Sequence, residues 1–304
     1  MLATPVDAAS PAIPVAAGAD VDDNAAMAGK EAPVADIAYL HLPSRELELT
    51  HLYGDNVHIL ADPFLLTHLA FLCTEGTQQP AINSIVRDLY QYLIKAVMNG
   101  ELPRVVRAID TRMSALSPHG TWTGEILDPD VRAVTVNIMR AGTLPSQTCY
   151  DFLNKTLTPR LVRQDHVVMS RVTNAAGQVT GSAFGDSKIG GDVDNAYVLF
   201  PDPMGATGGS LCQAIEHYKT KVSGTAKKYI TVNLIVTPEY LRRMKAEHPD
   251  VVVYALRLDR GASPDDVKGT IPGTHWERES GLTDKQYIVP GGGGFGEIMN
   301  NAWC

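Results

Sequence analysis

Residues 200–210 read Phe-Pro-Asp-Pro-Met-Gly-Ala-Thr-Gly-Gly-Ser, and this stretch decides how the rest of the chain is interpreted. The apolar run 197–200 predicts a strand before it, and the helical spacing of Leu211, Ile215 and Tyr218 predicts a helix after it. A glycine-rich turn between a strand and a helix can direct several backbone amides, and the helix dipole, at one phosphate group. The Gly-Lys-Ser/Thr ending of a Walker loop is missing. The stretch therefore predicts a phosphate-binding turn of a different kind.

Strands and helices alternate on both sides of this turn. Apolar runs predict further strands, and helical spacing or N-cap and proline chemistry predicts helices. The expected strands are 134–139, 230–236 and 251–258; the expected helices are 63–72, 82–97, one started by Pro145, and one started by Thr237-Pro238. This alternation predicts an α/β fold with a parallel sheet, helices on both faces and a ligand site at the carboxyl ends of the strands.

Two polar segments interrupt the alternation, and the start of the chain has a different composition. Residues 171–194 are rich in glycine and are interpreted either as a hairpin flap over the site or as a surface loop, and residues 261–280 form a second insertion. Residues 1–45 are rich in Ala, Pro, Asp and Gly, so they cannot bury enough apolar surface to offset their ordering entropy. We expect a disordered extension over 1–45 and one domain over 46–304.

Composition excludes several classes of protein. A net charge of -8 gives no basic field for a nucleic-acid backbone, and the chain has no run of about 20 apolar residues that could span a membrane. The four cysteines are scattered without metal-site spacing, which indicates a reducing compartment. The N-terminus lacks the basic and apolar regions of a signal peptide. We therefore expect a cytoplasmic protein that binds small molecules.

The turn resembles the phosphoribosyl-diphosphate (PRPP) loop of type I phosphoribosyltransferases, and most closely that of the uracil phosphoribosyltransferase family. The family form is Asp-Pro-Met-Leu-Ala-Thr-Gly-Gly-Ser, and only Gly205, in place of Leu, departs from it. Residues 138–142, Ile-Met-Arg-Ala-Gly, are similar to the family's Ile-Leu-Arg-Ala-Gly, and residues 287–291, Tyr-Ile-Val-Pro-Gly, match the opening of its uracil site. Weaker matches at 248–251 and 259–261 lie between the turn and residues 287–291, in the same order as in the family.

The resemblance implies a parallel sheet flanked by helices, with a flap or hairpin arm and a hood over the active site. It implies Asp202 and Arg140 as the catalytic residues, with Mg²⁺ carried by PRPP and no metal ligand from the protein. The implied PRPP-binding residues are Arg140, Ala141, Gly142, Arg171, Asp202, Pro203, Met204, Gly205, Ala206, Thr207, Gly208, Gly209 and Ser210. The implied uracil-binding residues are Tyr287, Ile288, Gly293, Gly294 and Phe295. Homodimers or larger homo-oligomers are usual in the family.

The C-terminal segment departs from the family pattern. The family continues Pro-Gly-Leu-Gly-Asp-Ala-Gly-Asp-Arg, whereas residues 290–298 read Pro-Gly-Gly-Gly-Gly-Phe-Gly-Glu-Ile. Gly294 therefore stands where the resemblance implies an Asp linked to PRPP. The four glycines can also be interpreted as a flexible tail.

Three functions remain open from the sequence. The resemblance implies a uracil phosphoribosyltransferase, which transfers the phosphoribosyl group of PRPP to uracil and gives UMP and diphosphate. The alternatives are a regulatory protein that binds PRPP or a nucleotide without transfer, and a phosphoribosyltransferase for another base.

Overall fold

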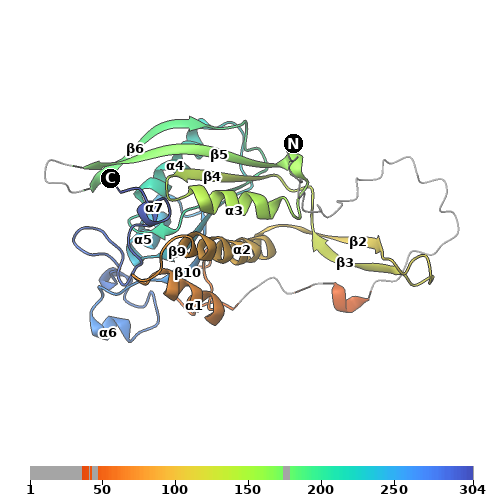
Figure 1. Ribbon diagram of the computed structural model, residues 1–304, viewed down its shortest axis with the longest axis horizontal. Coiled ribbons are helices and arrows are strands. Elements are labelled where there is room, and N and C mark those ends of the chain that lie inside the picture. The colour runs from red at the N-terminus through yellow and green to blue at the C-terminus, as the bar shows by residue number, and fades with distance from the viewer. Residues whose placement is uncertain (1–35, 41, 43–46, 174–178, 304) are drawn as a thin grey trace, which may run out of the picture.

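The computed structural model describes residues 36–40, 42, 47–173 and 179–303 (Figure 1). The extension expected over 1–45 therefore lies largely outside the described residues. In the part that the structure describes, no helix is long and apolar enough to cross a membrane.

One mostly parallel sheet organises the molecule, as the alternation of strands and helices predicts (Figure 1). Its strand order is β1-β10-β9-β7-β4-β5-β6, and a short strand, β8, pairs with β9 outside this path. Only β6 runs antiparallel to its neighbour. The strands are β1 (Val57–Ile59), β4 (Ala133–Met139), β5 (Val162–Thr173), β6 (Val179–Lys188), β7 (Tyr197–Pro201), β8 (Met204–Gly205), β9 (Lys228–Val236) and β10 (Val252–Leu258).

Helices cover both faces of this sheet, because alternate residues of each strand point to opposite sides. On one face, α1 (Pro63–Leu72), α2 (Ala81–Glu101) and α3 (Thr143–Leu153) share one hydrophobic core with Ile230, Val232 and Leu234 of β9. On the other face, α4 (Gly209–Lys221) and α5 (Pro238–Glu247) pack on a second core that includes Val198 and Phe200 of β7. The α/β fold with helices on both faces is confirmed.

Helix boundaries follow the local chemistry of the sequence in most places. Asp62 caps α1 by accepting hydrogen bonds from the amides of Phe64 and Leu65, and Thr237 caps α5 by accepting one from Tyr240. Helix α3 begins at Thr143, two residues before the proline expected to start it. Both positions lie in the first turn, where a proline removes no hydrogen bond that the helix needs.

Two hairpins extend from the sheet region. Strands β5 and β6 form a long antiparallel pair, so the segment from 171 onward is a hairpin rather than a plain surface loop. Strands β2 (Arg104–Asp110) and β3 (Thr121–Leu127) form a second, separate hairpin that projects from the body (Figure 1). No sequence pattern predicts this second hairpin, which we call the β2–β3 arm.

The C-terminal segment after β10 contains three short helical turns, α6 (Asp265–Lys268), η3 (Trp276–Arg278) and α7 (Phe295–Ile298). Figure 1 shows α6 and α7 beyond the carboxyl ends of the parallel strands, the position expected of the hood. This segment therefore lies at the end of the sheet where a ligand site is expected.

Candidate functional site

The two motif-bearing strands, β4 and β7, are neighbours in the centre of the sheet. They pair in parallel, with Ala133 opposite Tyr197 and Thr135 opposite Leu199. From β4 the chain crosses to β5 on one side, whereas β7 is followed by β9 on the other side, so the strand order reverses between β4 and β7. Such a switch point forms a crevice at the carboxyl ends of the strands, where open α/β sheets bind ligands.

Arg140 and Asp202 each follow the carboxyl end of one of these strands, so the fold brings the two expected catalytic residues to the same crevice. One carboxylate oxygen of Asp202 accepts a hydrogen bond from the amide of Met204 at 3.0 Å. The carbonyl of Asp202 accepts one from Asn233 Nδ2 at 2.7 Å. These two hydrogen bonds hold the half-buried Asp202 at the base of the turn.

The first part of the turn, 202–206, is tied to β9 and α5. Met204 and Gly205 form β8, which pairs with Ile235 and Val236. The carbonyl of Ala206 accepts a hydrogen bond from Thr237 Oγ1 at 2.6 Å. The amide of Ala206 donates to the carbonyl of Met204 at 3.0 Å, so this amide, expected to face a phosphate, is engaged inside the turn.

The second part of the turn opens onto α4. Gly208 has a positive φ of 78°, which glycine adopts without strain, and α4 begins at the next residue. Within the described residues, the amides of Thr207 and Gly208 donate to no protein acceptor. The first amides of α4, beginning with Gly209 and Ser210, have no acceptor inside the helix. These amides are therefore the ones that the structure leaves open for the phosphate that the sequence predicts at this turn.

A basic residue that sequence reasoning missed lies beside this turn. Arg243 of α5 approaches Gly209 so closely that a Cβ there would stand 3.1 Å from Arg243 Nη1. Arg243 also pairs with Glu247 at 2.7 Å and is substantially exposed. No motif marks Arg243 in the sequence. Arg243 follows Tyr240 by one helical turn, and the Tyr240 ring packs on the same loop, which is the one connection between Arg243 and the site.

The Arg140 turn is built closely against β7. The Met139–Arg140 peptide bond is cis, and the amide of Gly142 donates to the carbonyl of Ile138 at 2.9 Å. A Cβ at Gly142 would stand 2.8 Å from the Ile138 carbonyl oxygen and 3.0 Å from that of Pro201, so only glycine fits. Arg140 is exposed and turns toward the C-terminal segment, where its Nη1 donates to the carbonyl of Ala302 at 3.1 Å.

The glycine run 291–294 is anchored at its start and is not a free tail. The amide of Gly291 donates to Asp259 Oδ2 at 2.7 Å, and its carbonyl accepts from Arg257 Nη2 at 3.0 Å. Arg257 and Asp259 form a two-point ion pair. Burial raises the pKa of Cys73, which lies against Arg257.

The residues expected to bind the base differ in accessibility. Ile288 and the ring of Phe295 are buried in the core, so Phe295 can offer a ligand only its backbone groups. Tyr287 is exposed. Gly293 has a φ of 82° and open space where a Cβ would stand. Gly296 lies beside Ala141, which brings this segment to the Arg140 turn.

Arg171 lies on β5, where its backbone pairs with Ser182 across the hairpin. Strand β5 is the neighbour of β4, and Val168 stands opposite Met139. Arg171 is therefore three residues beyond the level at which β4 ends. The orientation of its side chain lies outside what the structure describes.

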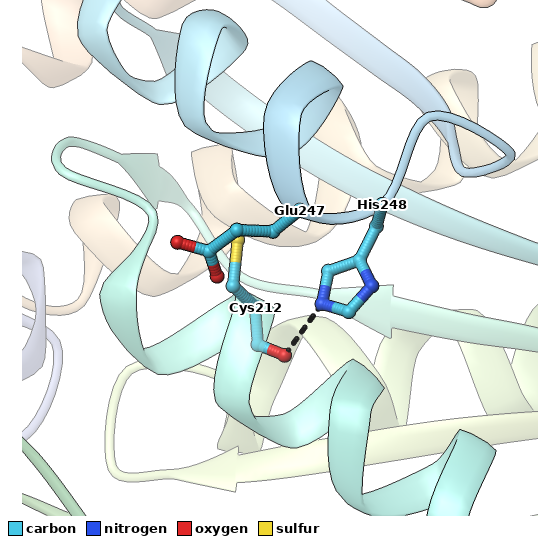
Figure 2. Close-up of side chains that lie close together, drawn as sticks. All are labelled: Cys212, Glu247 and His248. Atoms are coloured by element: carbon cyan, nitrogen blue, oxygen red, sulfur yellow. Dashed lines mark hydrogen bonds between the residues drawn. The ribbon is translucent and has the colours of Figure 1, made fainter.

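One group of side chains has the residue types of a metal site. Cys212, Glu247 and His248 lie close together where α4 meets the end of α5 (Figure 2). His248 Nε2 is bound to the Cys212 carbonyl at 2.9 Å, and Nδ1 faces Lys219 Nζ at 3.5 Å. Burial raises the pKa of the Cys212 thiol to about 12. The hydrogen bond from His248 to the Cys212 carbonyl ties the end of α5 to α4.

Comparison with known proteins adds independent information. The profile of the family described as uracil phosphoribosyltransferase matches residues 59–275. A uracil phosphoribosyltransferase of Roseiflexus sp. (strain RS-1) is 27% identical over 245 residues, which are 80% of this chain and 97% of the relative. That of Mycoplasma capricolum subsp. capricolum is 36% identical over 106 residues, 35% of this chain but only 40% of the relative.

A similar fold has also been solved. The structure of the AQ2163 protein from Aquifex aeolicus superposes with a TM-score of 0.60 at 18% identity, over 80% of this chain and 97% of the other. The family match ends at residue 275, before the segment 287–298 that holds the residues expected to contact a base.

Proposed function

This chain belongs to the uracil phosphoribosyltransferase family, and on that premise we propose that it transfers the phosphoribosyl group of PRPP to uracil, giving UMP and diphosphate. Its mostly parallel sheet with helices on both faces agrees with the type I phosphoribosyltransferase fold that the resemblance implies. One observation carries the proposal: the Arg140 turn and the Asp202 turn meet at the switch point between β4 and β7. A substrate with a phosphate at one end and a diphosphate at the other fits two separate anion-binding turns.

In the proposed binding mode, the 5′-phosphate lies on the amides of residues 207–210. Charge-assisted hydrogen bonds of this kind contribute about 1.5–3 kcal/mol each. Arg243, beside the same turn, adds positive charge there. The substrate is the magnesium complex of PRPP, whose diphosphate lies against Arg140 and the amides of Ala141 and Gly142.

The reaction forms a bond from uracil N1 to C1 of the ribose and breaks the bond from C1 to the diphosphate oxygen. The N1 proton leaves with the diphosphate or passes to water. Positive charge grows on the ribose ring as the diphosphate leaves, so groups fixed in advance should lower the barrier most. The Asp202 carboxylate favours the cationic ribose, and Arg140 stabilises the departing anion. Arg171, on the β5–β6 hairpin, can close over the diphosphate and exclude water.

The base side of the site lies in the C-terminal segment. We propose that uracil lies between the exposed Tyr287 and the backbone of residues 293–295. The family match ends before this segment, and Gly294 lacks the acid that the resemblance implies. These two observations favour a phosphoribosyltransferase for another base as the second candidate.

The deciding experiment measures PRPP-dependent nucleotide formation by the purified chain with magnesium present. Uracil, hypoxanthine, guanine, adenine and orotate are tested side by side, and we expect UMP and diphosphate from uracil. Transfer to another base would show that uracil is the wrong substrate, while the chain would still be a phosphoribosyltransferase. PRPP binding without any diphosphate release would instead indicate a regulatory protein and would refute the proposed enzymatic activity.

We also propose that the chain assembles as a homo-oligomer. The β2–β3 arm exposes large apolar side chains, including Val106, Ile109 and Leu116. An isolated two-stranded hairpin is only marginally stable in water, so a second copy packed on the arm would stabilise it. Light scattering after size-exclusion chromatography should give at least twice the mass of one chain. Replacing Ile109 and Leu116 with Lys should shift the mass toward the monomer.

A further inference from the structure

Three side chains of the kinds that bind metals meet where α4 and α5 come together (Figure 2). Cys212 lies in the first turn of α4, and Glu247 and His248 stand at the end of α5. One ligand atom from each residue lies within 4.8 Å of the other two. The ligand atoms of a tetrahedral zinc ion stand about 3–4 Å apart, so small side-chain rotations would close this group around a metal.

The chemistry of the three groups selects the class of metal. A sulfur, an imidazole nitrogen and a carboxylate oxygen together suit Zn²⁺, whereas Mg²⁺ prefers oxygen ligands and keeps much of its water. Cys212 and His248 are buried, and the Glu247 side chain is 44% exposed, so a cation can enter from the Glu247 side. Three protein ligands leave the fourth position of a tetrahedral ion for water.

Hydrogen bonds already hold these groups together. His248 Nε2 donates to the Cys212 carbonyl at 2.9 Å, and the Cys212 thiol is hydrogen-bonded to the Glu247 carboxylate (Figure 2). A bound metal replaces two hydrogens: the thiol proton passes to water, and the hydrogen on Nε2 is exchanged for one on Nδ1. Lys219 faces Nδ1 at 3.5 Å, but Asp250 binds Lys219 at 2.5 Å, so this lysine does not depend on the ring for a partner.

Glu247 connects this group with the turn 207–210. Its Oε1 accepts a hydrogen bond from Arg243 Nε at 2.7 Å, and Arg243 Nη1 is 3.1 Å from the place of a Cβ at Gly209. Without a metal, burial keeps the Cys212 thiol neutral by raising its pKa to about 12, so the group carries the single negative charge of Glu247. Zn²⁺ bound to a thiolate and a carboxylate brings that charge to zero. The turn beside Arg243 then carries more positive potential.

We propose that Cys212, Glu247 and His248 bind Zn²⁺. The bound ion draws Glu247 away from Arg243 and thereby strengthens phosphate binding at the turn 207–210. The metal site itself is independent of the proposed transfer reaction, whereas its effect on the turn rests on the phosphate-binding part of the proposed function. Linkage requires the reverse effect as well, so a phosphate on the turn tightens zinc binding by the same factor.

The first experiment tests the metal site by calorimetry of the chain, stripped of metal with EDTA, against Zn²⁺. Cys212→Ala and His248→Gln should each weaken binding by about a hundredfold or more, since loss of even an outer partner of a metal ligand costs about 10–100-fold. Cys149→Ala, a change of a buried cysteine outside the group, is the matched control and should bind as the wild type does.

Two measurements on the wild type need no variant that must fold. Zn²⁺ should raise the melting temperature, and an equal concentration of Mg²⁺ should not. Co²⁺ in place of Zn²⁺ should give the absorption band of a cobalt–thiolate bond, and this band should be missing from Cys212→Ala. A wild type that binds no Zn²⁺, or Zn²⁺ affinity that Cys212→Ala leaves unchanged, would overturn the site.

The second experiment tests the effect on the turn with ribose 5-phosphate, which carries the phosphate without a diphosphate. Its Kd is measured by calorimetry with one equivalent of Zn²⁺ and with EDTA. Zinc should tighten binding by about two- to fivefold, the range expected for release of an exposed ion pair. Glu247→Gln should show the tighter binding without zinc, and Arg243→Gln should remove the effect of zinc.

The outcomes separate the two parts of the inference. Weaker ribose 5-phosphate binding in Glu247→Gln would show that Glu247 positions Arg243 for the phosphate, and would overturn the release that we propose. Equal binding with and without zinc would also overturn it. A wild type that binds Zn²⁺ but no ribose 5-phosphate would refute the proposed phosphate site, and the coupling with it, while the metal site would stand on the first experiment.

Discussion

Replacing Gly205 with Leu, the residue that the family carries in the turn, should destabilise this protein. Gly205 is buried, and a Cβ there would stand 3.0 Å from Val236 Cγ1 and 3.1 Å from the ring of Tyr240. These distances are shorter than ordinary carbon contacts. Neither neighbour can move easily, because Val236 lies in the sheet and the Tyr240 hydroxyl donates to Thr231 Oγ1 at 2.8 Å.

The size of the effect follows from this packing. Extra carbon atoms in a well-packed core typically cost about 1–3 kcal/mol. For a domain of this size, that lowers the melting temperature by about 2–12 °C. Gly205→Ala should change stability much less, because loss of unfolded-state freedom offsets about 0.4–1 kcal/mol of the strain.

Urea unfolding followed by circular dichroism measures the free energy of unfolding, and a double-mutant cycle locates the cause. If Tyr240 is the obstacle, Gly205→Leu should cost less in a Tyr240→Ala background, with a coupling energy of about 0.5–3 kcal/mol. A Gly205→Leu protein as stable as the wild type would refute the steric explanation. So would identical costs in the two backgrounds.

Four further predictions concern single residues. Asp202→Ala should lower kcat/KM for transfer by more than about tenfold, which corresponds to about 1.4 kcal/mol. A smaller loss in steady-state assays would contradict the proposed role of Asp202. Arg243→Gln should weaken PRPP binding, measured by calorimetry, without changing the base that is accepted. Burial lowers the pKa of His51 in the folded protein, so the His51 side chain binds a proton more tightly in the unfolded chain. The free energy of unfolding should therefore fall as the pH drops below about 6.5, and His51→Gln should flatten that dependence. Urea titrations at pH 5.5 and 7.5 measure both. Because burial raises the pKa of Cys212 to about 12, its thiol should resist iodoacetamide at pH 8 in the folded protein and react after unfolding, as mass spectrometry can follow.

The sequence was most informative where a local pattern determines a local structure. The apolar runs located β4, β7, β9 and β10 to within two residues, since buried parallel strands are short and continuously apolar. The N-cap chemistry of Thr237 located α5 in the same way. The small-residue turn after β7 correctly indicated the junction between that strand and α4.

Features that depend on distant parts of the chain could not be predicted. Arg243 reaches the turn only because α5 packs beside α4, and nothing near it in the sequence marks that contact. The β2–β3 arm was also missed, since its strands carry mixed polar and apolar residues and β2 is largely exposed.

The β2–β3 arm leaves and re-enters the body at nearly one point, because the amide of Asp128 donates to the carbonyl of Pro103 at 2.9 Å. Residues 104–127 are thus a module with its own ladder and a closed base. A short glycine linker should be able to replace this module at little entropic cost, since closing so small a gap restrains few residues. The excised chain would let folding and the proposed transfer reaction be measured apart from the proposed assembly, and the vacated junction would accept a foreign hairpin.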